Sequence, residues 1–467
     1  MKEFRIHWRW NSIGRPFKTI PWIVSALIAG HPGSGFHHAW AVQPETTANL
    51  EAKIEKAATV ADLIAYAYRE NPSIQAAREE WKATVEEYKA ATALPDPQLL
   101  VSYFPEPIET RLGPQDWNLT LSQLIPYPGK LSKAGEVVQA DAQIARLKLD
   151  RAVRDMILSI RESFQELVYI REAKTVVKQN LQLLDHLRKV AETSYAEGRA
   201  VLMDMIKAQS QSGQLRYDAL LLEELEMTEK TRLNGILNRT PDAAVGTLEA
   251  EALLPVVFQL GELYRLAEAN QEEIRIAGME VEKADVKIDL ARYQYFPDFR
   301  FGLFYAAIGD PDVPQDPPDA GRDAFGVQAG LTLPLWFGQN KARLDMARAA
   351  MKKAKAAETA RINETRTRIR ELFFRLENSR RLMDLYGKEL LPQAARSMEI
   401  AETWFREGES TFSDFVETQA VWYNFQLALA RARADYGKFL ARLERLVGQS
   451  LTVKTSTSVE DAGKGVQ

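Results

Sequence analysis

Two carboxylates are the residues of this chain whose spacing most clearly suggests chemistry. Asp414 and Glu417 stand three positions apart in the segment FREGESTFSDFVETQ, residues 405–419. On a helix, side chains at positions i and i+3 share one face, so both carboxylates would point the same way. Acidic groups held close together raise one another's pKa and attract cations. For Asp414, stabilisation of a helix start is the simpler alternative, because a carboxylate in the first turn interacts favourably with the helix dipole.

The segment that carries these carboxylates occurs twice. Residues 195–209 read YAEGRAVLMDMIKAQ and repeat the Glu-Gly pair, an apolar residue, the Asp and the Gln in the same frame. Gly198 and Gly408 suit a turn between two antiparallel helices. At the positions of the acidic pair the first copy has Asp204 and Lys207, so only the second copy carries two carboxylates.

Other reactive side chains are scarce. The chain has no Cys and five His, which excludes thiol nucleophiles and Cys/His zinc sites. Only His186 lies beyond the first 41 residues, so Ser-His-Asp triads and HExxH sites are excluded or nearly so. We therefore expect neither an enzyme nor a bound metal or cofactor.

The first 41 residues have the pattern of a secretory signal peptide. A basic segment precedes an apolar stretch over 20–30 (IPWIVSALIAG), and residues 39–41 (AWA) supply a small-x-small cleavage site. A signal-anchor helix is the alternative. Cleavage would remove five basic residues and one acidic residue, so the formal net charge of −4 would become −8. An acidic protein lacks the basic footprint of nucleic-acid binding.

Matching segments upstream of the two turns predict pairs of strands. LPDPQLLVSYF (94–104) corresponds to FPDFRFGLFYA (296–306), and WNLTLSQLIPYPGK (117–130) corresponds to FGVQAGLTLPLWFGQN (325–340). Apolar and polar residues alternate along these segments, which is typical of strands. The alternation fits both a strand half-buried in a soluble core and a strand that faces lipid on one side.

Two very long helices are predicted after the strands. Residues 131–197 contain one Gly and no Pro, and residues 341–407 contain one Gly and one Pro, Pro392. Apolar residues recur at 3/4 spacing, as in helices packed side by side in coiled-coil fashion. About 67 residues in one helix would span about 100 Å.

We therefore divide the chain into two repeats of helix, strand, strand, long helix and helix. The expected segments are a signal peptide (1–41), an N-terminal extension (42–58), a first repeat (59–238), a linker (239–257), a second repeat (258–448) and a disordered tail (449–467). Strands are expected near 98–104, 116–125, 299–306 and 324–334, and helical hairpins over 131–238 and 340–447.

Export and strand length together suggest a membrane barrel shared between copies. Strands of about eight to ten residues can cross a membrane in a tilted barrel. Four strands cannot close a barrel, and lipid does not tolerate open sheet edges. Three copies would supply twelve strands and a tube of twelve helices. The segments 105–115 and 308–322 are rich in Pro, Gly and Asp and should form solvent-exposed loops.

Aromatic residues mark the strand-to-helix junctions. Tyr127, Trp336 and Phe337 follow the second strand of each pair. They could form an aromatic belt at the membrane interface or simply cap the junctions. The pattern alone leaves both alternatives open.

With these elements in order, the chain resembles the TolC family of outer-membrane efflux proteins over essentially its whole mature length. The resemblance lies in IPYPGKL (125–131), LPLWFGQNKA (333–342), FPDF (296–299) and the duplicated EG turns. The PGKL sequence resembles the branch that works with heavy-metal RND pumps, as in CzcC- and CusC-like proteins.

The resemblance implies a mainly α fold with a small β-barrel contribution. A homotrimer would form a twelve-stranded barrel in outer-membrane lipid of a Gram-negative bacterium and a twelve-helix periplasmic tunnel. A periplasmic adaptor and an inner-membrane RND pump are the implied partners, with no nucleic acid, and the cargo would be metal cations or small toxic compounds. The implied adaptor contacts are Gly198, Leu202, Gly408 and Phe412, and the implied periplasmic aperture is formed by Asp414 and Glu417. A periplasmic coiled-coil scaffold or adaptor without a barrel is the alternative.

Overall fold

The computed structural model describes residues 46–196, 202–249, 252–312 and 318–452. These residues belong to one compact unit, Thr46–Gln467. The signal peptide (1–41), Gly198 and most of the expected tail lie outside the described residues. Among the described helices, none combines the length and the apolar composition that a membrane-spanning helix requires.

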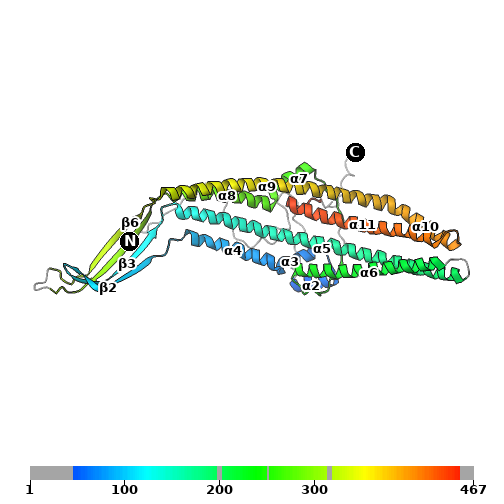
Figure 1. Ribbon diagram of the computed structural model, residues 1–467, viewed down its shortest axis with the longest axis horizontal. Helices are drawn as coiled ribbons and strands as arrows, with labels where there is room; N and C mark the ends of the chain where they lie inside the picture. Colours follow the sequence, from blue (N-terminus) through cyan, green and yellow to red (C-terminus); the bar gives the residue numbers. More distant parts are fainter. Residues whose placement is uncertain (1–45, 197–201, 250–251, 313–317, 453–467) are drawn as a thin grey trace, which may run out of the picture. The chain divides into compact units, whose positions relative to one another are not determined.

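Each repeat contains the predicted order of helix, strand, strand, long helix and helix (Figure 1). The elements of the first repeat are α4 (Pro72–Thr92), β2 (Gln98–Thr110), β3 (Gly113–Ile125), α5 (Lys130–Ala196) and α6 (Leu202–Leu237). Those of the second are α8 (Glu272–Tyr293), β5 (Asp298–Ile308), β6 (Ala324–Thr332), α9 (Phe337–Asp384), η1 (Leu385–Leu390), α10 (Leu391–Glu407) and α11 (Phe412–Val447).

The four long strands form one antiparallel sheet in the order β2-β3-β5-β6. The two repeats therefore meet at β3 and β5, where Leu121 lies opposite Leu303. Strands β2 and β6 are the edges of this sheet, and each has one side without a partner strand in the described chain. A single copy does not close the sheet.

The expectation of a loop over 105–115 is wrong. Strand β2 continues to Thr110 and β3 begins at Gly113, so the two form a hairpin with a tight turn. The register shifts between Tyr103 and Ile108, where Pro105 and Pro107 interrupt the regular ladder. Proline is tolerated there because β2 is an edge strand and the shift is a bulge.

The two long helices differ in continuity. Helix α5 runs unbroken over 67 residues, as predicted. The second long helix is interrupted by η1, a π-helical stretch of six residues directly before the α10 segment that contains Pro392. Proline has no backbone N–H and clashes with the preceding turn, and a wider turn relieves that clash.

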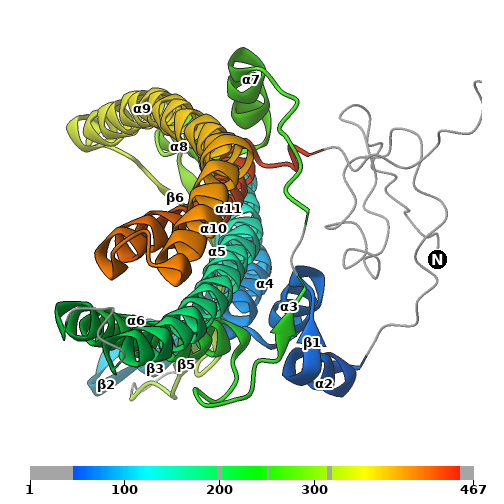
Figure 2. The same cartoon turned by 90° about the vertical axis from the view of Figure 1, so that its right-hand side faces the viewer.

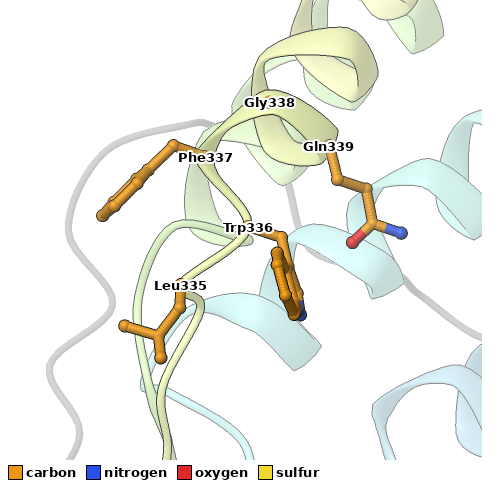
Figure 3. A pocket seen from close by; sticks show the side chains of 5 residues that line it. All are labelled: Leu335, Trp336, Phe337, Gly338 and Gln339. Atoms are coloured by element: carbon orange, nitrogen blue, oxygen red, sulfur yellow. The ribbon is translucent and has the colours of Figure 1, made fainter.

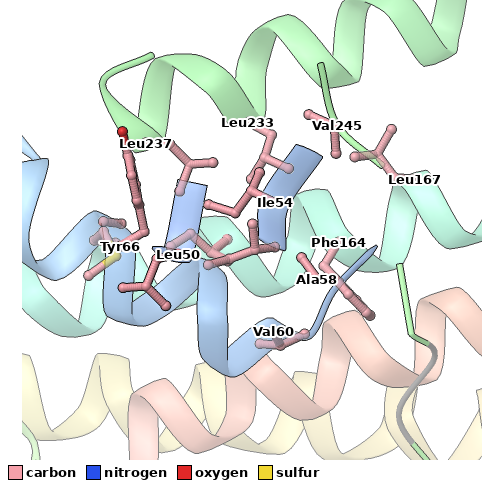
Figure 4. Close-up of a cluster of buried hydrophobic side chains, with 14 of the residues drawn as sticks. Leu50, Ile54, Ala58, Val60, Tyr66, Phe164, Leu167, Leu233, Leu237 and Val245 are labelled. Carbon is pink, nitrogen blue, oxygen red and sulfur yellow. The ribbon is translucent and has the colours of Figure 1, made fainter. Parts of the chain in front are cut away.

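Additional short elements flank the long helices. They are α2 (Thr47–Lys56), β1 (Ala57–Ala58), α3 (Val60–Glu70), β4 (Thr247–Leu248) and α7 (Leu260–Asn270), and β1 pairs with β4. Figure 2 shows the long helices as a curved layer with α2, α3 and α7 on the same side of it. Ile54, Leu63 and Leu237 form part of a buried cluster that fixes α2 and α3 against α5 and α6 (Figure 4).

Candidate functional site

The turn between α10 and α11 depends on Gly408. This residue has a left-handed conformation with φ +78°, which a side chain disfavours. Its N–H donates to the carbonyl of Phe405, and the N–H of Glu409 donates to the carbonyl of Trp404 (2.9 Å). These bonds satisfy carbonyls at the helix end. The predicted turn role of Gly408 is therefore confirmed.

An aromatic cluster fixes the angle between the two helices at this turn. The ring of Phe412 lies 5.5 Å from that of Phe405 and 6.2 Å from that of Phe415. Phe412 and Phe415 are fully buried. Phe412 therefore packs the inside of the turn, which differs from the direct adaptor contact that the sequence suggested.

The carboxylate of Asp414 belongs to a helix-capping box. It accepts hydrogen bonds from the Thr411 hydroxyl (2.7 Å) and the Thr411 N–H (3.1 Å), while the Asp414 N–H donates to the hydroxyl (3.2 Å). The bond from the Thr411 side chain and that from its backbone hold the pKa of Asp414 below its usual range. The same box, built by Thr59 and Asp62, begins α3. Asp414 thus has the structural role that was its simpler interpretation.

Glu417 lies one turn further along α11 and is exposed. Within the described part of the chain its carboxylate forms no hydrogen bond or ion pair. Lys207, on α6 of the first repeat, donates a hydrogen bond to the Ser413 hydroxyl of the second repeat (2.9 Å). Its charge also lowers the pKa of Asp414. The two carboxylates therefore differ in their surroundings. Asp414 accepts hydrogen bonds within the chain, whereas Glu417 is available to a ligand or to another protein chain.

The described residues of the two turns expose different apolar side chains. Leu202 is 47% exposed, whereas its counterpart Phe412 is fully buried. Met203 and Ile206 are also exposed beside Leu202. Gly198 lies outside the described residues. Two segments that match in sequence thus present different surfaces.

A second cluster joins the repeats where β3 ends and β5 begins. The Lys130 ammonium donates to the Asp298 carboxylate (2.7 Å) and to the carbonyl of Phe296 (2.9 Å). The Tyr127 N–H donates to the same carboxylate (2.8 Å), and the Tyr127 ring stacks on Phe296 at 4.5 Å. Tyr127 therefore caps this junction and is half-buried.

The corresponding residues after β6 have no such partners in the described chain. Leu335, Trp336 and Phe337 are 64%, 78% and 68% exposed. Together with Gly338 and Gln339 they line an open hollow of about 640 Å³ (Figure 3). The three aromatics predicted as one belt therefore occupy two kinds of environment.

Comparison with known proteins shows which proteins this chain is similar to. The Outer membrane efflux protein family matches residues 263–449. The pyoverdine export outer membrane protein OpmQ of Pseudomonas aeruginosa is 23% identical over 308 residues, which span 62% of this chain and 62% of that protein.

Solved structures share the fold over most of the chain. The outer membrane protein VceC of Vibrio cholerae has a TM-score of 0.69 at 19% identity, covering 84% of this chain and 96% of that one. CusC has a TM-score of 0.70 at 13% identity, covering 84% and 92%. The second half of the chain thus matches the outer membrane efflux protein family, and most of the chain has the fold of solved outer membrane channels.

These matches orient the molecule. The chain lies in the outer membrane, and its helical portion extends into the periplasm. The turns at the far ends of the helical hairpins thus lie away from the sheet (Figure 1).

Asn180 is a tip-proximal residue that the sequence reasoning missed. The Gln419 amide donates to its side-chain oxygen (2.8 Å), and both residues are almost fully buried between α11 and α5. The repeated Gln was visible in the sequence, but Gln209 of the first copy is exposed. A polar residue on an otherwise apolar helix stripe was the available signal.

Proposed function

We propose that this outer membrane efflux protein is the passive exit duct of a tripartite efflux system. Three copies would close a twelve-stranded barrel that continues into a twelve-helix periplasmic tunnel. The observation that carries this proposal is the four-stranded sheet with two open edges, β2 and β6. Unpaired strand edges are not tolerated in lipid. Pairing of β6 with β2 of the next copy would provide hydrogen-bond partners for both open edges.

The exposed apolar residues of the sheet support the same arrangement. Leu99, Tyr103, Val327 and Leu331 are each more than half exposed on the two edge strands. Such a surface in water would be an aggregation hazard, whereas lipid and neighbouring strands accommodate it.

The partners proposed are a periplasmic adaptor and an inner-membrane RND-type pump, which would supply the energy. The adaptor would dock on the two turns, at Gly198, Leu202, Gly408 and the backbone beside Phe412. Exposed Leu202 supports a direct apolar contact in the first turn. Buried Phe412 would act by holding the second turn in shape.

At the same end, Asp414 and Glu417 would narrow the aperture. Around a threefold axis they would form two stacked rings of carboxylates, which attract cations. Glu417 is exposed and has no partner in the described chain, so it would dominate the interaction with permeating ions, while Asp414 also caps its helix.

The cargo proposed is metal cations or small toxic compounds. The PGKL resemblance favours the heavy-metal branch. The named relative that exports pyoverdine shows that the family also handles organic compounds.

Single-channel recording in planar bilayers tests the duct and its aperture. Wild-type protein should conduct, and divalent cations should reduce the current. The double variant Asp414→Ala with Glu417→Ala should conduct more and be blocked less. Asp62→Ala removes the equivalent capping carboxylate far from the turn and should leave conductance and block unchanged.

Two results would contradict the proposal. Unchanged conductance and block in the double variant would remove the aperture role. A soluble periplasmic product, in place of heat-modifiable trimers in the detergent-extracted outer-membrane fraction, would instead favour the coiled-coil scaffold.

A further inference from the structure

The junction between β3 and α5 is closed inside the chain by residues of the second repeat. Asp298 accepts hydrogen bonds from the Tyr127 N–H and the Lys130 ammonium. The Tyr127 ring covers Phe296. A side chain at Gly129 would collide with Tyr293, whose ring lies 2.5 Å from the position of an added Cβ. The junction is thus tightly packed on the segment that precedes β5.

The equivalent junction between β6 and α9 is open. In the second repeat, Trp336 stands in the place of Tyr127, and Gln339 in the place of Lys130. In the first repeat, the segment before β2 has Leu94 in the place of Phe296, and Asp96 in the place of Asp298. Trp336 is 78% exposed and Asp96 is exposed, whereas their counterparts Tyr127 and Asp298 are partly buried. Leu94 and its counterpart Phe296 are 54% and 44% exposed. An added Cβ at Gly338 would meet nothing within 4 Å. Each half of a junction is present, and the two halves lie at opposite edges of the sheet.

We propose that these two halves join between neighbouring copies of the chain. In this junction the backbone N–H of Trp336 donates to Asp96 of the next copy, and the Trp336 ring covers its Leu94. The Gln339 amide takes the place of the Lys130 ammonium as the second donor to Asp96. The inference rests on the proposed assembly of copies into one barrel, and it assigns which residues hold the copies together at the base of that barrel.

The surface around Trp336 is open to an occupant. The hollow of about 640 Å³ lined by residues 335–339 is open. In the view of Figure 3, Trp336 and Gln339 extend to one side of the junction, and Phe337 extends to the other. In the proposed junction, Trp336 and Gln339 face the next copy, and Phe337 faces outward as a belt residue.

The helices beside the junctions continue the same relation. Within the chain, α5 packs on α8, and Lys283 of α8 donates to Asp141 of α5 (2.9 Å). The corresponding helices α9 and α4 leave Met346 (69%) and Tyr88 (45%) exposed. The contact between copies is thus continuous from the sheet edge along the first turns of the helices.

The repeat also specifies the register of the strand pairing between copies. Inside the chain, Gln123 lies opposite Phe301 and Leu119 lies opposite Tyr305. The same register places Leu331 opposite Leu99 of the next copy, and Val327 opposite Tyr103. A shift by one residue would exchange the two faces of the sheet.

Disulfide trapping tests the junction, because the chain contains no Cys. Two single-cysteine chains with different affinity tags, Asp96→Cys and Trp336→Cys, are co-expressed, and the detergent-extracted protein is oxidised. We expect a disulfide-linked pair that carries both tags on non-reducing denaturing gels. Asp96→Cys combined with Phe337→Cys is the matched control and should not cross-link, because residue 337 faces away.

A second cysteine pair, Leu99→Cys with Leu331→Cys, reports on strand pairing itself. If this pair cross-links and the 96–336 pair does not, the junction is wrong and the shared barrel stands. If neither pair cross-links and the detergent-extracted protein is monomeric, the proposed assembly fails together with the junction. Equal cross-linking of residues 336 and 337 to residue 96 would also overturn the assigned orientation.

Gln339→Lys gives an independent test by restoring the ammonium found at Lys130. The temperature at which the copies dissociate in detergent should rise by several degrees. In an Asp96→Ala background the substitution should have no effect, since the acceptor is missing. An equal rise in both backgrounds would show that residue 339 does not act on Asp96.

Discussion

Glu226 gives the most quantitative prediction of how the periplasmic helices are held together. Its carboxylate on α6 accepts hydrogen bonds from Lys174 (2.7 Å), Lys230 (2.9 Å) and Arg171 (3.2 Å). Arg171 also donates to the carbonyl of Gly246, in the segment between the repeats. The Glu226 side chain is only 12% exposed, and its single carboxylate is bonded to three cations that converge from two helices.

The size of the effect follows from the pKa of Glu226. Burial raises this pKa, but the hydrogen bonds from Lys174, Lys230 and Arg171 outweigh burial and lower it from 4.5 to about 2. That difference corresponds to roughly 3 kcal/mol of stability. The cations are partly solvated, which screens the interaction, so we expect about 2 kcal/mol. Because the folded pKa is depressed, this stability is present above pH 4.5 and is lost as the pH falls towards 2.

The assay compares Glu226→Gln with Glu224→Gln, an exposed carboxylate two residues away. Urea unfolding of the detergent-solubilised protein, followed by helix circular dichroism, gives the free energy of unfolding. At pH 7, Glu226→Gln should be less stable than the Glu224→Gln control by about 2 kcal/mol. The difference should shrink steadily between pH 4.5 and pH 2, and other carboxylates cancel because both variants retain them. Equal stability at pH 7, or a difference that stays constant with pH, would refute this account of Glu226.

Two further substitutions test the turn and its support, both by the same unfolding assay. Gly408→Ala should lower the free energy of unfolding by about 1 kcal/mol, because an alanine disfavours the positive φ of this residue. Gly235→Ala, in the exposed last turn of α6, should raise it by about 0.5–1 kcal/mol. A change of the same sign at both positions would contradict the argument from backbone conformation. Gln419→Leu should lower the free energy of unfolding by about 1–3 kcal/mol, because it leaves the buried Asn180 oxygen without its hydrogen-bond donor. Adding Asn180→Leu in the same chain should recover part of that loss. If the effects of the two substitutions simply add, the pair does not act as a unit.

Much of the fold could be predicted from the sequence because the determining signals are local. The alternation that begins at Trp117 and the near absence of Gly and Pro in α5 each act within a few turns or strand residues. The β2–β3 hairpin was misjudged because Pro105 and Pro107 usually mark loops. Their tolerance depends on β2 being an edge strand, which only the tertiary arrangement reveals.

The candidate site was less predictable because its environment comes from distant segments. Leu202 and Phe412 match in sequence, yet one is exposed and the other is buried against Phe405 and Phe415. The apolar character of both positions was visible, but the first repeat has Tyr195 in place of Phe405 and Met205 in place of Phe415, and this difference in packing could not be judged from the sequence.

The Lys130–Asp298 pair escaped prediction for the same reason. These residues lie in different repeats and meet only because β3 is the neighbour of β5. Their charges gave no indication of a partner until the strand order was known. The repeat supplied matching segments, and the sheet order decided which of them pair within one chain.

The two repeats are similar in sequence but differ in their contacts, and this difference has a physical explanation. A chain built from two similar units, when closed by other copies, contains two kinds of junction: one made within the chain and one made between chains. The internal junction is charged and buried at Lys130 and Asp298, while its counterpart uses the neutral Gln339. Gln339 is exposed in the single chain, so nothing within one copy requires a charge at this position. The internal junction, in contrast, holds the Lys130 ammonium away from water, where an ammonium needs the Asp298 carboxylate as its partner.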